Sequence, residues 1–373
     1  MIHDIAIIGA GMAGASLASG LGGAGRVLLI EAESQPGYHA TGRSAAFWTE
    51  SYGGPAVQPL TTASHGWLAD GGFLAPRGAV HLAGPGDAGL LDAMLATFGD
   101  RIRLERLDRA ALEAMIPGLR PGHAHALLEP SCRDIDVAAL HADYLARGRR
   151  AGVDLLRDAR VAGMARRDGV WDLALADGRR VAARIVVNAA GAWAGAVAAM
   201  AGARPIPIAP LRRTMVQLAV SPAPSPALPL VIDIAGTYYM KPDAGGRLWL
   251  SPHDETPAPP GDAAPDELDV AVAIDRLQRT VDWTVLARER AWAGLRSFAP
   301  DRAPIYGFDT QAAGFFWFAG QGGFGIQTAP AAAMIGAALL TGGDLPDVVA
   351  AVDVERYGPG RFGQAAKLTA LRT

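Results

Sequence analysis

Apolar residues open the chain in two short runs that flank a glycine-rich turn. The first run covers residues 5–8 and leads into Gly-Ala-Gly-Met-Ala-Gly, and the second, at 27–30, ends at Glu31. Short apolar runs bounded by turn residues are typical of buried strands, and the alanine-rich stretch between these two is typical of a helix. The pattern therefore predicts a strand, a helix and a second strand, which together form a βαβ unit.

The glycines of this turn have the spacing of a dinucleotide-binding loop. Gly9 permits a tight turn, Gly11 lets a pyrophosphate approach the backbone, and Gly14 lets the helix pack closely on the strand. The amino end of the helix presents unpaired N–H groups to the phosphates. Glu31 lies where a carboxylate accepts hydrogen bonds from an adenosine ribose. The alternative is an ordinary structural turn, because glycines also mark such turns.

Two kinds of region follow along the chain. Residues 54–128 alternate short helices with short strands and carry no glycine fingerprint, which favours an inserted region that binds no nucleotide. Residues 206–298 are typical of antiparallel strands with one helix, and suit a lid or a floor for a substrate. Predicted helices cover 87–98, 109–116, 136–150 and 266–281; predicted strands cover 78–82, 206–220, 230–234, 238–241, 247–250, 290–298 and 314–319, with a small strand set at 155–183 and a strand, turn and helix from 185.

Composition and charge narrow the class of protein. The length of 373 residues is that of two domains, and 50% hydrophobic residues supply large buried cores. The formal net charge of −3 gives no electrostatic reason to expect nucleic acid or an anionic membrane surface. Cys132 is the only cysteine, which excludes an intrachain disulfide and a cysteine-rich metal site; we predict no metal and a cytoplasmic location. We expect no signal peptide and no transmembrane segment, since the uncharged run at 185–203 contains Asn188 and many small residues.

Two further stretches are candidates for cofactor contacts. A polar loop at residues 32–48 leads into small residues and suits a second phosphate or flavin contact, with Arg43 and Ser44 as donors. The alternative there is a surface loop with a capping serine. Near the other end of the chain, a glycine-rich loop at 320–328 precedes an apolar helix. A plain entry into that helix is the alternative to a cofactor contact.

Two glycine-rich strand-to-helix turns are more than a nicotinamide-binding domain needs. With the stretches around them, they make the chain resemble the D-amino-acid oxidase type of FAD-dependent oxidoreductase, which includes glycine oxidase and sarcosine oxidase. Within this family the chain looks most like bacterial D-amino-acid dehydrogenases, and D-arginine dehydrogenase in particular. The resemblance covers essentially the whole chain, and its motifs are the first βαβ unit, GYHATGRSAAFWTESYG, VVNAAGAW, LRR, YYMKPDAG, WAGLRSF and GFFWFAGQGGFGIQT.

The resemblance implies an α/β fold with non-covalent FAD. A Rossmann-type FAD-binding domain would comprise residues 1–74, 131–205 and 299–373, and an interleaved α+β substrate domain with a largely antiparallel β-sheet would comprise 75–130 and 206–298. Val161 would contact adenine through its backbone, residues 40–47 would line the flavin, and the loop 322–327 would place N–H groups near the flavin N1/O2 edge, where reduced flavin carries negative charge. The implied cofactor contacts are Gly9, Gly11, Ala13, Gly14, Glu31, Ala32, Thr41, Gly42, Arg43, Ser44, Ala45, Ala46, Val161, Gly191, Gly322, Gly323, Phe324, Gly325, Ile326 and Gln327.

The resemblance also implies which residues contact a substrate. Arg213 and Arg296 match positions that face the substrate carboxylate, a role that suits the two-point geometry of a guanidinium. Tyr52 and Tyr239 match positions around the substrate, and the carbonyl of Gly323 would accept a hydrogen bond from the amine. Either arginine alone is also compatible with a surface ion pair, and Tyr239 with ordinary sheet packing.

Departures from D-arginine dehydrogenase indicate a different substrate side chain. Ala79 stands where that enzyme has an acidic residue facing the substrate guanidinium, and Phe47 stands where it has histidine. An unpaired guanidinium in an apolar pocket loses on the order of several kcal/mol. We therefore predict that neutral, apolar D-amino acids fit better than D-arginine. The residues expected to line the pocket are Phe47, Ala79, Leu230 and Ile232; whether His81 or Glu50 restores polarity, and what His39 does, stays open.

The implied reaction moves a hydride from the substrate α-carbon to flavin N5. It gives an imino acid, which water hydrolyses to an α-keto acid and ammonia, and no histidine or carboxylate is an obvious general base. We favour a dehydrogenase that passes electrons to a quinone, with peripheral membrane association through that acceptor, because Trp249 lies in the strand where oxygen-using relatives place a lysine. The alternatives are an oxygen-using D-amino-acid, glycine or sarcosine-type oxidase, a nicotinamide-dependent dehydrogenase and a non-catalytic flavin-binding protein.

Overall fold

The chain passes in turn through two units. The computed structural model describes residues 1–243 and 245–363. Unit 1 consists of Met1–Thr41, Ala138–Ala209 and Ser297–Thr373, and unit 2 of Gly42–Val137 and Pro210–Arg296. The last ten residues of the predicted segment 299–373, and Ala244 of the YYMKPDAG motif, lie outside the described residues.

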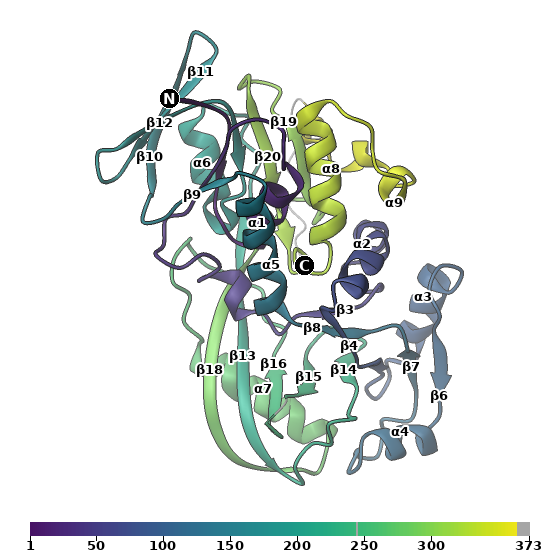
Figure 1. The fold of residues 1–373 in the computed structure, drawn as a ribbon. Coiled ribbons are helices and arrows are strands. Elements are labelled where there is room, and N and C mark those ends of the chain that lie inside the picture. The colour runs from purple at the N-terminus through teal and green to yellow at the C-terminus, as the bar shows by residue number, and fades with distance from the viewer. Residues whose placement is uncertain (244, 364–373) are drawn as a thin grey trace. The chain divides into compact units, whose positions relative to one another are not determined.

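A mostly parallel sheet forms the centre of unit 1 (Figure 1). β1 (Ile2–Ile8) pairs in parallel with β2 (Val27–Ile30) on one side and with β12 (Arg180–Asn188) on the other. α1 (Met12–Gly20) connects β1 to β2, which confirms the predicted βαβ unit. The other strands of this sheet are β9 (Asp154–Leu156), which is parallel to β2, and β20 (Phe315–Ala319), which is parallel to β12. The antiparallel pairs are β10 (Val161–Arg167) with β11 (Val170–Leu175), β11 with β12, and β19 (Ile305–Phe308) with β20.

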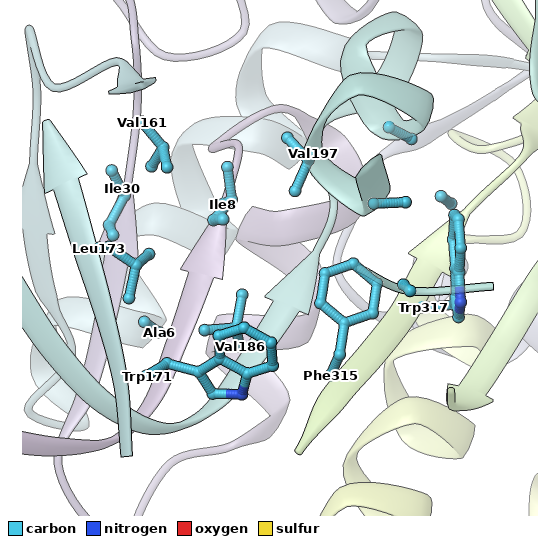
Figure 2. Packing of buried hydrophobic residues seen from close by; sticks show 14 of the residues in the cluster. Ala6, Ile8, Ile30, Val161, Trp171, Leu173, Val186, Val197, Phe315 and Trp317 are labelled. Carbon is cyan, nitrogen blue, oxygen red and sulfur yellow. The ribbon is translucent and has the colours of Figure 1, made fainter. Parts of the chain in front are cut away.

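Apolar side chains from sequence-distant strands hold this sheet in place. Figure 2 shows Ala6 and Ile8 of β1 in the same buried cluster as Val186 of β12 and Phe315 of β20. Because these strands run in parallel, their carboxyl ends lie at one edge of the sheet, where the glycine-rich turns begin. The helices of unit 1, besides α1, are α5 (Val137–Arg150, from Ala138 on), α6 (Ala194–Met200), α8 (Ala329–Thr341) and α9 (Asp347–Ala350), with 3₁₀ turns η2 (Gly191–Trp193), η3 (Val354–Tyr357) and η4 (Pro359–Phe362). The 3₁₀ turn η1 (Ala40–Arg43) crosses the chain boundary between the two units.

Unit 2 is built around a second, largely antiparallel sheet, as predicted. Its strands lie in the order β18-β13-β16-β15-β14-β5-β7-β6. The pairs from β13 to β14 and from β5 to β6 are antiparallel, and β14 and β5 pair in parallel. The bounds are β5 (Ala79–Leu82), β6 (Glu105–Leu107), β7 (Ala126–Glu129), β13 (Ala209–Ser221), β14 (Leu230–Asp233), β15 (Tyr239–Pro242), β16 (Leu248–Ser251) and β18 (Thr284–Phe298), with β17 (Thr256–Pro257) beside β13; β21 (Gln321–Gly322) pairs with Ser297 and Phe298 in unit 1.

A small third sheet makes the division of the chain differ from the predicted boundaries. β8 (Arg133–Ile135) pairs with β3 (Phe47–Trp48) and β4 (Leu74–Pro76). Residues 42–74 and 131–137, which the sequence analysis groups with the FAD-binding domain, therefore belong to unit 2. The reason is that the glycine fingerprint marks only the turn next to the phosphates, whereas strands of two or three residues have too short a pattern to reveal their partners.

The helices and strands otherwise follow the predicted pattern closely. β18 begins at Thr284, six residues before the predicted strand, because residues 286–290 are all exposed and lack the apolar alternation that marks a strand. The helices of unit 2 are α2 (Gln58–Asp70), α3 (Ala88–Phe98), α4 (Arg109–Met115) and α7 (Glu267–Thr280). Among the helices within 1–243 and 245–363, none combines the length and the hydropathy that a membrane span requires.

Candidate functional site

The first glycine-rich turn, residues 9–14, is called the phosphate loop below. Gly9 has φ +103°, and a Cβ there would lie 2.5 Å from the carbonyl oxygen of Ala189. A Cβ on Gly14 would lie 1.8 Å from the carbonyl oxygen of Gly9. Both positions therefore require glycine, as the dinucleotide fingerprint predicts for the turn and for close helix packing.

The amino end of α1 is left open toward a ligand. Gly11 is the N-cap and has no side chain to cap the helix, so the N–H groups of Ala13 and Gly14 in the first turn have no acceptor within the helix. The N–H of Met12 donates to Oγ1 of Thr41 over 2.9 Å, which holds the predicted flavin residue Thr41 against this turn. An anion such as a pyrophosphate fits the remaining donors and the positive end of the helix dipole.

Two side chains clamp the peptide of Ala10 in the phosphate loop. The carboxylate of Glu31 accepts from the N–H of Ala10 at 2.8 Å and from the N–H of Glu33 at 3.0 Å. From α5, Nε2 of His141 donates to the carbonyl of Ala10 over 2.8 Å. Burial lowers the pKa of His141, which favours the neutral ring. The ribose contact of Glu31 stays a prediction, and sequence analysis missed His141 because its partner lies 131 positions away.

Other predicted cofactor residues of unit 1 lie at irregular points of the backbone. Val161 starts the edge strand β10, where the register with β11 shifts between Val161 and Gly163. Gly191 begins η2 after β12 with φ +53°, and Ala32 is exposed after Glu31. An edge strand with a register shift leaves backbone groups available, as an adenine contact requires. These contacts stay predictions.

The second glycine-rich loop also requires glycine at defined positions. Gly322 has φ +56°, and a Cβ there would lie 2.5 Å from the ring of Phe298. A Cβ on Gly325 would lie 2.8 Å from the Cβ of Gln321. The loop ends at Thr328, the N-cap of α8, whose hydroxyl donates to the carbonyl of Phe324 rather than capping the helix. The predicted contacts of Gly323, Phe324, Ile326 and Gln327 with flavin and substrate stay predictions.

The predicted flavin residues 42–46 have partners inside unit 2. Arg43 donates to the carbonyls of Ala263 and Ala293, each at 3.1 Å, and forms an ion pair with Asp262. Oγ of Ser44 accepts from the N–H of Ala46 at 3.1 Å, which is the turn role that the sequence left as the alternative. The flavin contacts of Gly42, Arg43, Ser44, Ala45 and Ala46 therefore stay predictions, and the Arg43 guanidinium already has acceptors of its own.

Arg213, Arg296, Tyr52 and Tyr239 of unit 2 lie together and are called the arginine cluster. Nη1 of Arg296 donates to the hydroxyl of Tyr52 over 2.6 Å. Arg213 is only 4% exposed; its Nε donates to the carbonyl of Asp254 at 2.8 Å and its Nη2 to Glu255 at 3.3 Å. Its Nη1 is buried and has no hydrogen-bond partner among the described residues.

Electrostatics inside the arginine cluster favour an anion. Burial and the neighbouring Arg296 lower the pKa of Arg213. For Arg296, burial opposes the charged form, but Tyr52 and Tyr239 outweigh it and raise the pKa. Burial disfavours the phenolate of Tyr52, but the two arginines outweigh burial and lower the pKa of Tyr52. For Tyr239 burial dominates and raises the pKa. A bound carboxylate would offset the repulsion between the two cations and supply the acceptor that Nη1 of Arg213 lacks.

The four residues predicted to line a pocket share one buried apolar cluster with Tyr239. Phe47 makes ring contacts with Tyr52 and Tyr239, at centroid distances of 5.2 and 5.7 Å. Tyr239 itself donates to the sulfur of Met215 at 3.0 Å. The cluster consists of Ala45, Phe47, Ala79, Cys132, Met215, Leu230, Ile232 and Tyr239, with Tyr52, Trp249 and Trp292 packed against it.

The polar residues left open by the sequence are engaged elsewhere. His81 and Ser51 donate to the fully buried carboxylate of Glu129, at 3.1 and 2.5 Å. Burial disfavours ionised Glu129, but these hydrogen bonds outweigh it and lower its pKa to about 2. Glu50 accepts from the hydroxyl of Thr62, so both His81 and Glu50 have polar partners of their own. In unit 1, His39 pairs with Glu33 at 2.9 Å and packs on Trp193.

His253 is a member of the site that sequence analysis missed. Its Nε2 lies 3.2 Å from the hydroxyl of Tyr52, and its ring packs edge to face on Tyr239 at 5.7 Å. His253 follows β16 in the segment Ser-Pro-His-Asp-Glu, where no helical or strand periodicity marks it. Its φ of +56° is uncommon for a residue other than glycine and singles out His253 as an unusual position. This backbone angle is visible in the structure but not in the sequence.

Comparisons with known proteins agree with the geometry of both units. A family model described as DAO, FAD dependent oxidoreductase, matches residues 4–339. Over 256 residues the chain is 28% identical to hydrogen cyanide synthase subunit HcnC of Pseudomonas aeruginosa, covering 68% of this chain and 60% of that protein. The chain thus spans less than two thirds of the length of this curated relative.

Solved structures show the same fold. Glycine oxidase from Geobacillus kaustophilus superposes with a TM-score of 0.81 at 24% identity, over 95% of this chain and 98% of that one. L-proline dehydrogenase from P. horikoshii superposes with a TM-score of 0.83 at 22% identity, over 97% and 98%. Together with the family match, these likenesses confirm the predicted Rossmann-type FAD fold with a sheet-based second domain.

Proposed function

The chain belongs to the FAD dependent oxidoreductase family, with FAD as its cofactor, and we propose that it oxidises D-amino acids with neutral, apolar side chains. The products are imino acids, which water hydrolyses to α-keto acids and ammonia. The preference for the D enantiomer rests on the resemblance of the chain to bacterial D-amino-acid dehydrogenases. Glycine oxidase and L-proline dehydrogenase share the fold, so glycine and L-amino acids are the natural competitors to test.

A buried guanidinium nitrogen without a partner carries this proposal. Nη1 of Arg213 is one of the few buried donors that lack an acceptor among the described residues, and a second cation, Arg296, lowers the pKa of its guanidinium. An unsatisfied buried donor costs about 1–3 kcal/mol, which a functional ligand recovers. A substrate carboxylate is a planar anion with two acceptor oxygens and suits a guanidinium.

The apolar cluster supports a neutral substrate side chain. Ala79 is fully buried among Phe47, Leu230 and Ile232. The carboxylate of Glu129, whose backbone pairs with that of Ala79, is already held by Ser51 and His81. A cationic side chain placed there would lose its hydration without gaining a partner. D-leucine, D-methionine or D-phenylalanine therefore fit better than D-arginine.

Each unit has a separate task in the proposed reaction. When bound, FAD supplies the two-electron acceptor for the hydride of the substrate α-carbon. The phosphate loop and Glu31 would hold its ADP part, and residues 322–327 its flavin part. Arg213 and Arg296 would bind and orient the carboxylate, and the carbonyl of Gly323 would accept a hydrogen bond from the amine. Positioning of this kind accounts for a large share of catalysis in two-substrate reactions.

A quinone is the proposed electron acceptor. Oxygen reduction gains from a cation that stabilises superoxide, whereas the strand in question carries Trp249, which packs edge to face on Trp292 at 5.4 Å. Lys241 lies 5.6 Å from the ring of Trp249, but Asp134 at 2.6 Å neutralises it. Anaerobically reduced protein mixed with oxygen tests this choice, because rapid reoxidation would favour the oxygen-using oxidase.

Anaerobic bleaching of the flavin absorbance tests the function itself. The panel contains D- and L-forms of leucine, methionine and arginine, together with glycine, sarcosine and D-proline. We expect the fastest bleaching with D-leucine or D-methionine, and much slower bleaching with D-arginine. Bleaching by L-amino acids or glycine alone would assign a different substrate, and a yellow protein that no amine bleaches would favour the non-catalytic flavin-binding alternative.

A further inference from the structure

A chain of three hydrogen bonds runs through Tyr52 in unit 2. Nη1 of Arg296 lies 2.6 Å from the Tyr52 hydroxyl, which lies 3.2 Å from Nε2 of His253. On the other side of the imidazole, Nδ1 lies 2.5 Å from the carbonyl oxygen of Gly236. The proposed function uses Arg296 to bind a carboxylate, but it leaves the other two links without a role.

The direction of each hydrogen bond follows from the groups involved. A carbonyl only accepts, so Nδ1 of His253 carries a proton that it donates to Gly236. A guanidinium only donates, so the oxygen of Tyr52 accepts from Arg296. In the neutral ring Nε2 is then an acceptor, and the Tyr52 hydroxyl donates its proton to it.

The same heavy atoms also fit the state with one more proton on the histidine. Imidazolium Nε2–H would donate to the Tyr52 oxygen, while Nδ1–H still donates to Gly236. No heavy atom has to move, because the Tyr52 proton passes to Nε2 along one hydrogen bond and the added proton takes its place on the Tyr52 oxygen. The pair therefore has a site for one additional proton, which reaches it through the Tyr52 hydroxyl.

The surrounding backbone holds His253 in this geometry. His253 has φ +56°, a region that residues other than glycine adopt at a cost and that recurs at functional sites. From α7, Arg276 donates to the carbonyls of Pro252 and Thr237, which are the neighbours of His253 and Gly236. Two segments of the chain are thus pinned so that the imidazole bridges Gly236 and Tyr52.

We propose that Tyr52 and His253 form a proton relay that takes the proton from the ammonium group of the amino-acid substrate, an inference that rests on the proposed function. Amino acids enter as zwitterions near neutral pH, whereas loss of the α-hydride requires the nitrogen lone pair of the neutral amine. One N–H bond of the ammonium breaks as an O–H bond forms at Tyr52. The original Tyr52 O–H bond breaks as an N–H bond forms at Nε2 of His253. Between turnovers, this N–H bond breaks and His253 releases the proton to water.

The charges around the relay couple it to carboxylate binding. Arg296 from β18 and Arg213 from β13 oppose a further positive charge, and Tyr239 from β15 packs on the ring. Asp254 and Glu255 follow His253 directly in the chain and pair with Arg213. A bound carboxylate offsets a positive charge in the cluster and so favours the imidazolium form of His253. The substrate's own acid group would thereby assist the deprotonation of its amine.

Substitution of His253 tests the relay in the FAD-loaded protein. His253→Phe removes the acceptor, and His253→Gln keeps a polar contact for Tyr52 but takes no proton. His65→Phe is the control, since His65 is a half-buried histidine of the same unit whose ring packs at a tilt against Trp48. The readout is the limiting rate of anaerobic flavin reduction by the best D-amino acid of the panel as a function of pH.

We expect both His253 variants to reduce about 100-fold more slowly than the wild type near neutral pH, the usual range for a lost proton transfer. Above pH about 10, where the substrate arrives with a neutral amine, the rates should come within about threefold of the wild type. His65→Phe should follow the wild type throughout. Tyr52→Phe should have the same pH dependence, and combining it with His253→Phe should add little, because both act on one step.

A binding experiment tests the relay without turnover. Isobutyrate has the carboxylate of an amino acid but no amine, and calorimetry in buffers of different ionisation enthalpy counts the protons taken up when it binds. We expect the wild type and His65→Phe to take up protons when isobutyrate binds near neutral pH, and His253→Phe to take up none.

The outcomes separate the two proposals. If amino acids bleach the wild-type flavin while the His253 variants keep the wild-type pH profile or proton uptake, the relay is wrong and the proposed function stands. If no amino acid bleaches the wild-type flavin at any pH, the proposed function is wrong, and the relay, which depends on it, is wrong as well.

Discussion

The phosphate loop of unit 1 depends on backbone packing, whereas the arginine cluster of unit 2 depends on contacts between side chains. The loop is made of backbone: Gly9 and Gly14 are needed because other main-chain atoms occupy the places of their Cβ atoms. The cluster is made of side chains from separate segments, and its hydrogen bonds join positions as far apart as Tyr52 and Arg296. We therefore expect substitutions that add side-chain volume to disrupt the loop, and substitutions that remove a charge to disrupt the cluster.

Gly14→Ala is the change with the largest expected effect. The added Cβ would lie 1.8 Å from the carbonyl oxygen of Gly9, a backbone atom that cannot swing away. Overlap of this kind forces α1 off β1, and we expect a loss of about 4 kcal/mol or more in the free energy of unfolding, together with loss of bound FAD. Thermal unfolding and the flavin absorbance of the purified protein measure the two effects.

Gly195→Ala is the matched control in the same unit. Gly195 lies in α6, has an ordinary φ, and has open space where a Cβ would go. Alanine there should retain FAD and stabilise the protein by about 0.5–1 kcal/mol, because alanine is the better helix former. Equal FAD content in the Gly14 and Gly195 variants would contradict the view that volume controls the loop.

The same contrast explains what could be predicted from the sequence. The βαβ unit, the second glycine loop and the sheet strands follow from short-range patterns, and the structure places them within a few residues of expectation. The resemblance to a known family led to Arg213, Arg296, Tyr52 and Tyr239, which do lie together. His141 and His253 were missed because each acts through a contact more than 100 positions away, and such contacts leave no periodicity.

Glu129→Gln should have the next largest effect, through charge in unit 2. Its carboxylate accepts from Ser51 and His81 and from the N–H of Glu50, and so anchors the segment that precedes Tyr52. The pKa falls from 4.5 to about 2 on folding, which at about 1.4 kcal/mol per unit corresponds to about 3 kcal/mol. Because the folded pKa is depressed, this stability is present above pH about 4.5 and is lost as the pH falls toward about 2.

Denaturant unfolding of wild type and Glu129→Gln across this range of pH measures the effect. The wild type should lose about 3 kcal/mol more than the variant between pH about 5 and about 2. Glu113→Gln is the control, since Glu113 is an exposed carboxylate paired with Arg109 in α4. If Glu113→Gln and Glu129→Gln changed the pH dependence equally, the buried network would not be its source.

Arg213→Gln and Arg212→Gln compare two adjacent arginines of β13. Each has one buried nitrogen without a hydrogen bond to any described residue, Nη1 in Arg213 and Nε in Arg212. Arg213 lies beside Arg296 in the arginine cluster, whereas Arg212 forms ion pairs with Asp266 and Asp269. Loss of a charged hydrogen bond to the substrate carboxylate costs about 1.5–3 kcal/mol, so KM for the best D-amino acid should rise about 10- to 150-fold in Arg213→Gln. Arg212→Gln should leave KM within about twofold, because it keeps the cluster intact.

Steady-state kinetics with a quinone analogue as acceptor gives both KM values. The notion that the cluster binds a carboxylate would be abandoned if the two variants had the same KM. Binding of isobutyrate, measured by calorimetry, should weaken in parallel with the rise in KM for Arg213→Gln.

His141→Phe should have the smallest effect, and it is informative because it returns to the phosphate loop. The phenyl ring keeps the volume that packs against Gly37 but loses the donor to the carbonyl of Ala10. A single lost hydrogen bond of this kind costs about 1 kcal/mol, so the Kd for FAD should rise about fivefold in fluorescence titrations of the apoprotein. His123→Phe removes a similar buried donor, to the carbonyl of Ala83 in unit 2, and should lower thermal stability without changing the Kd for FAD. Each of the two histidines donates a hydrogen bond to a backbone carbonyl, so a difference in FAD affinity between the two variants isolates the contribution of the hydrogen bond to Ala10. Equal FAD affinities of the two variants would mean that the glycines alone hold the phosphate loop in shape.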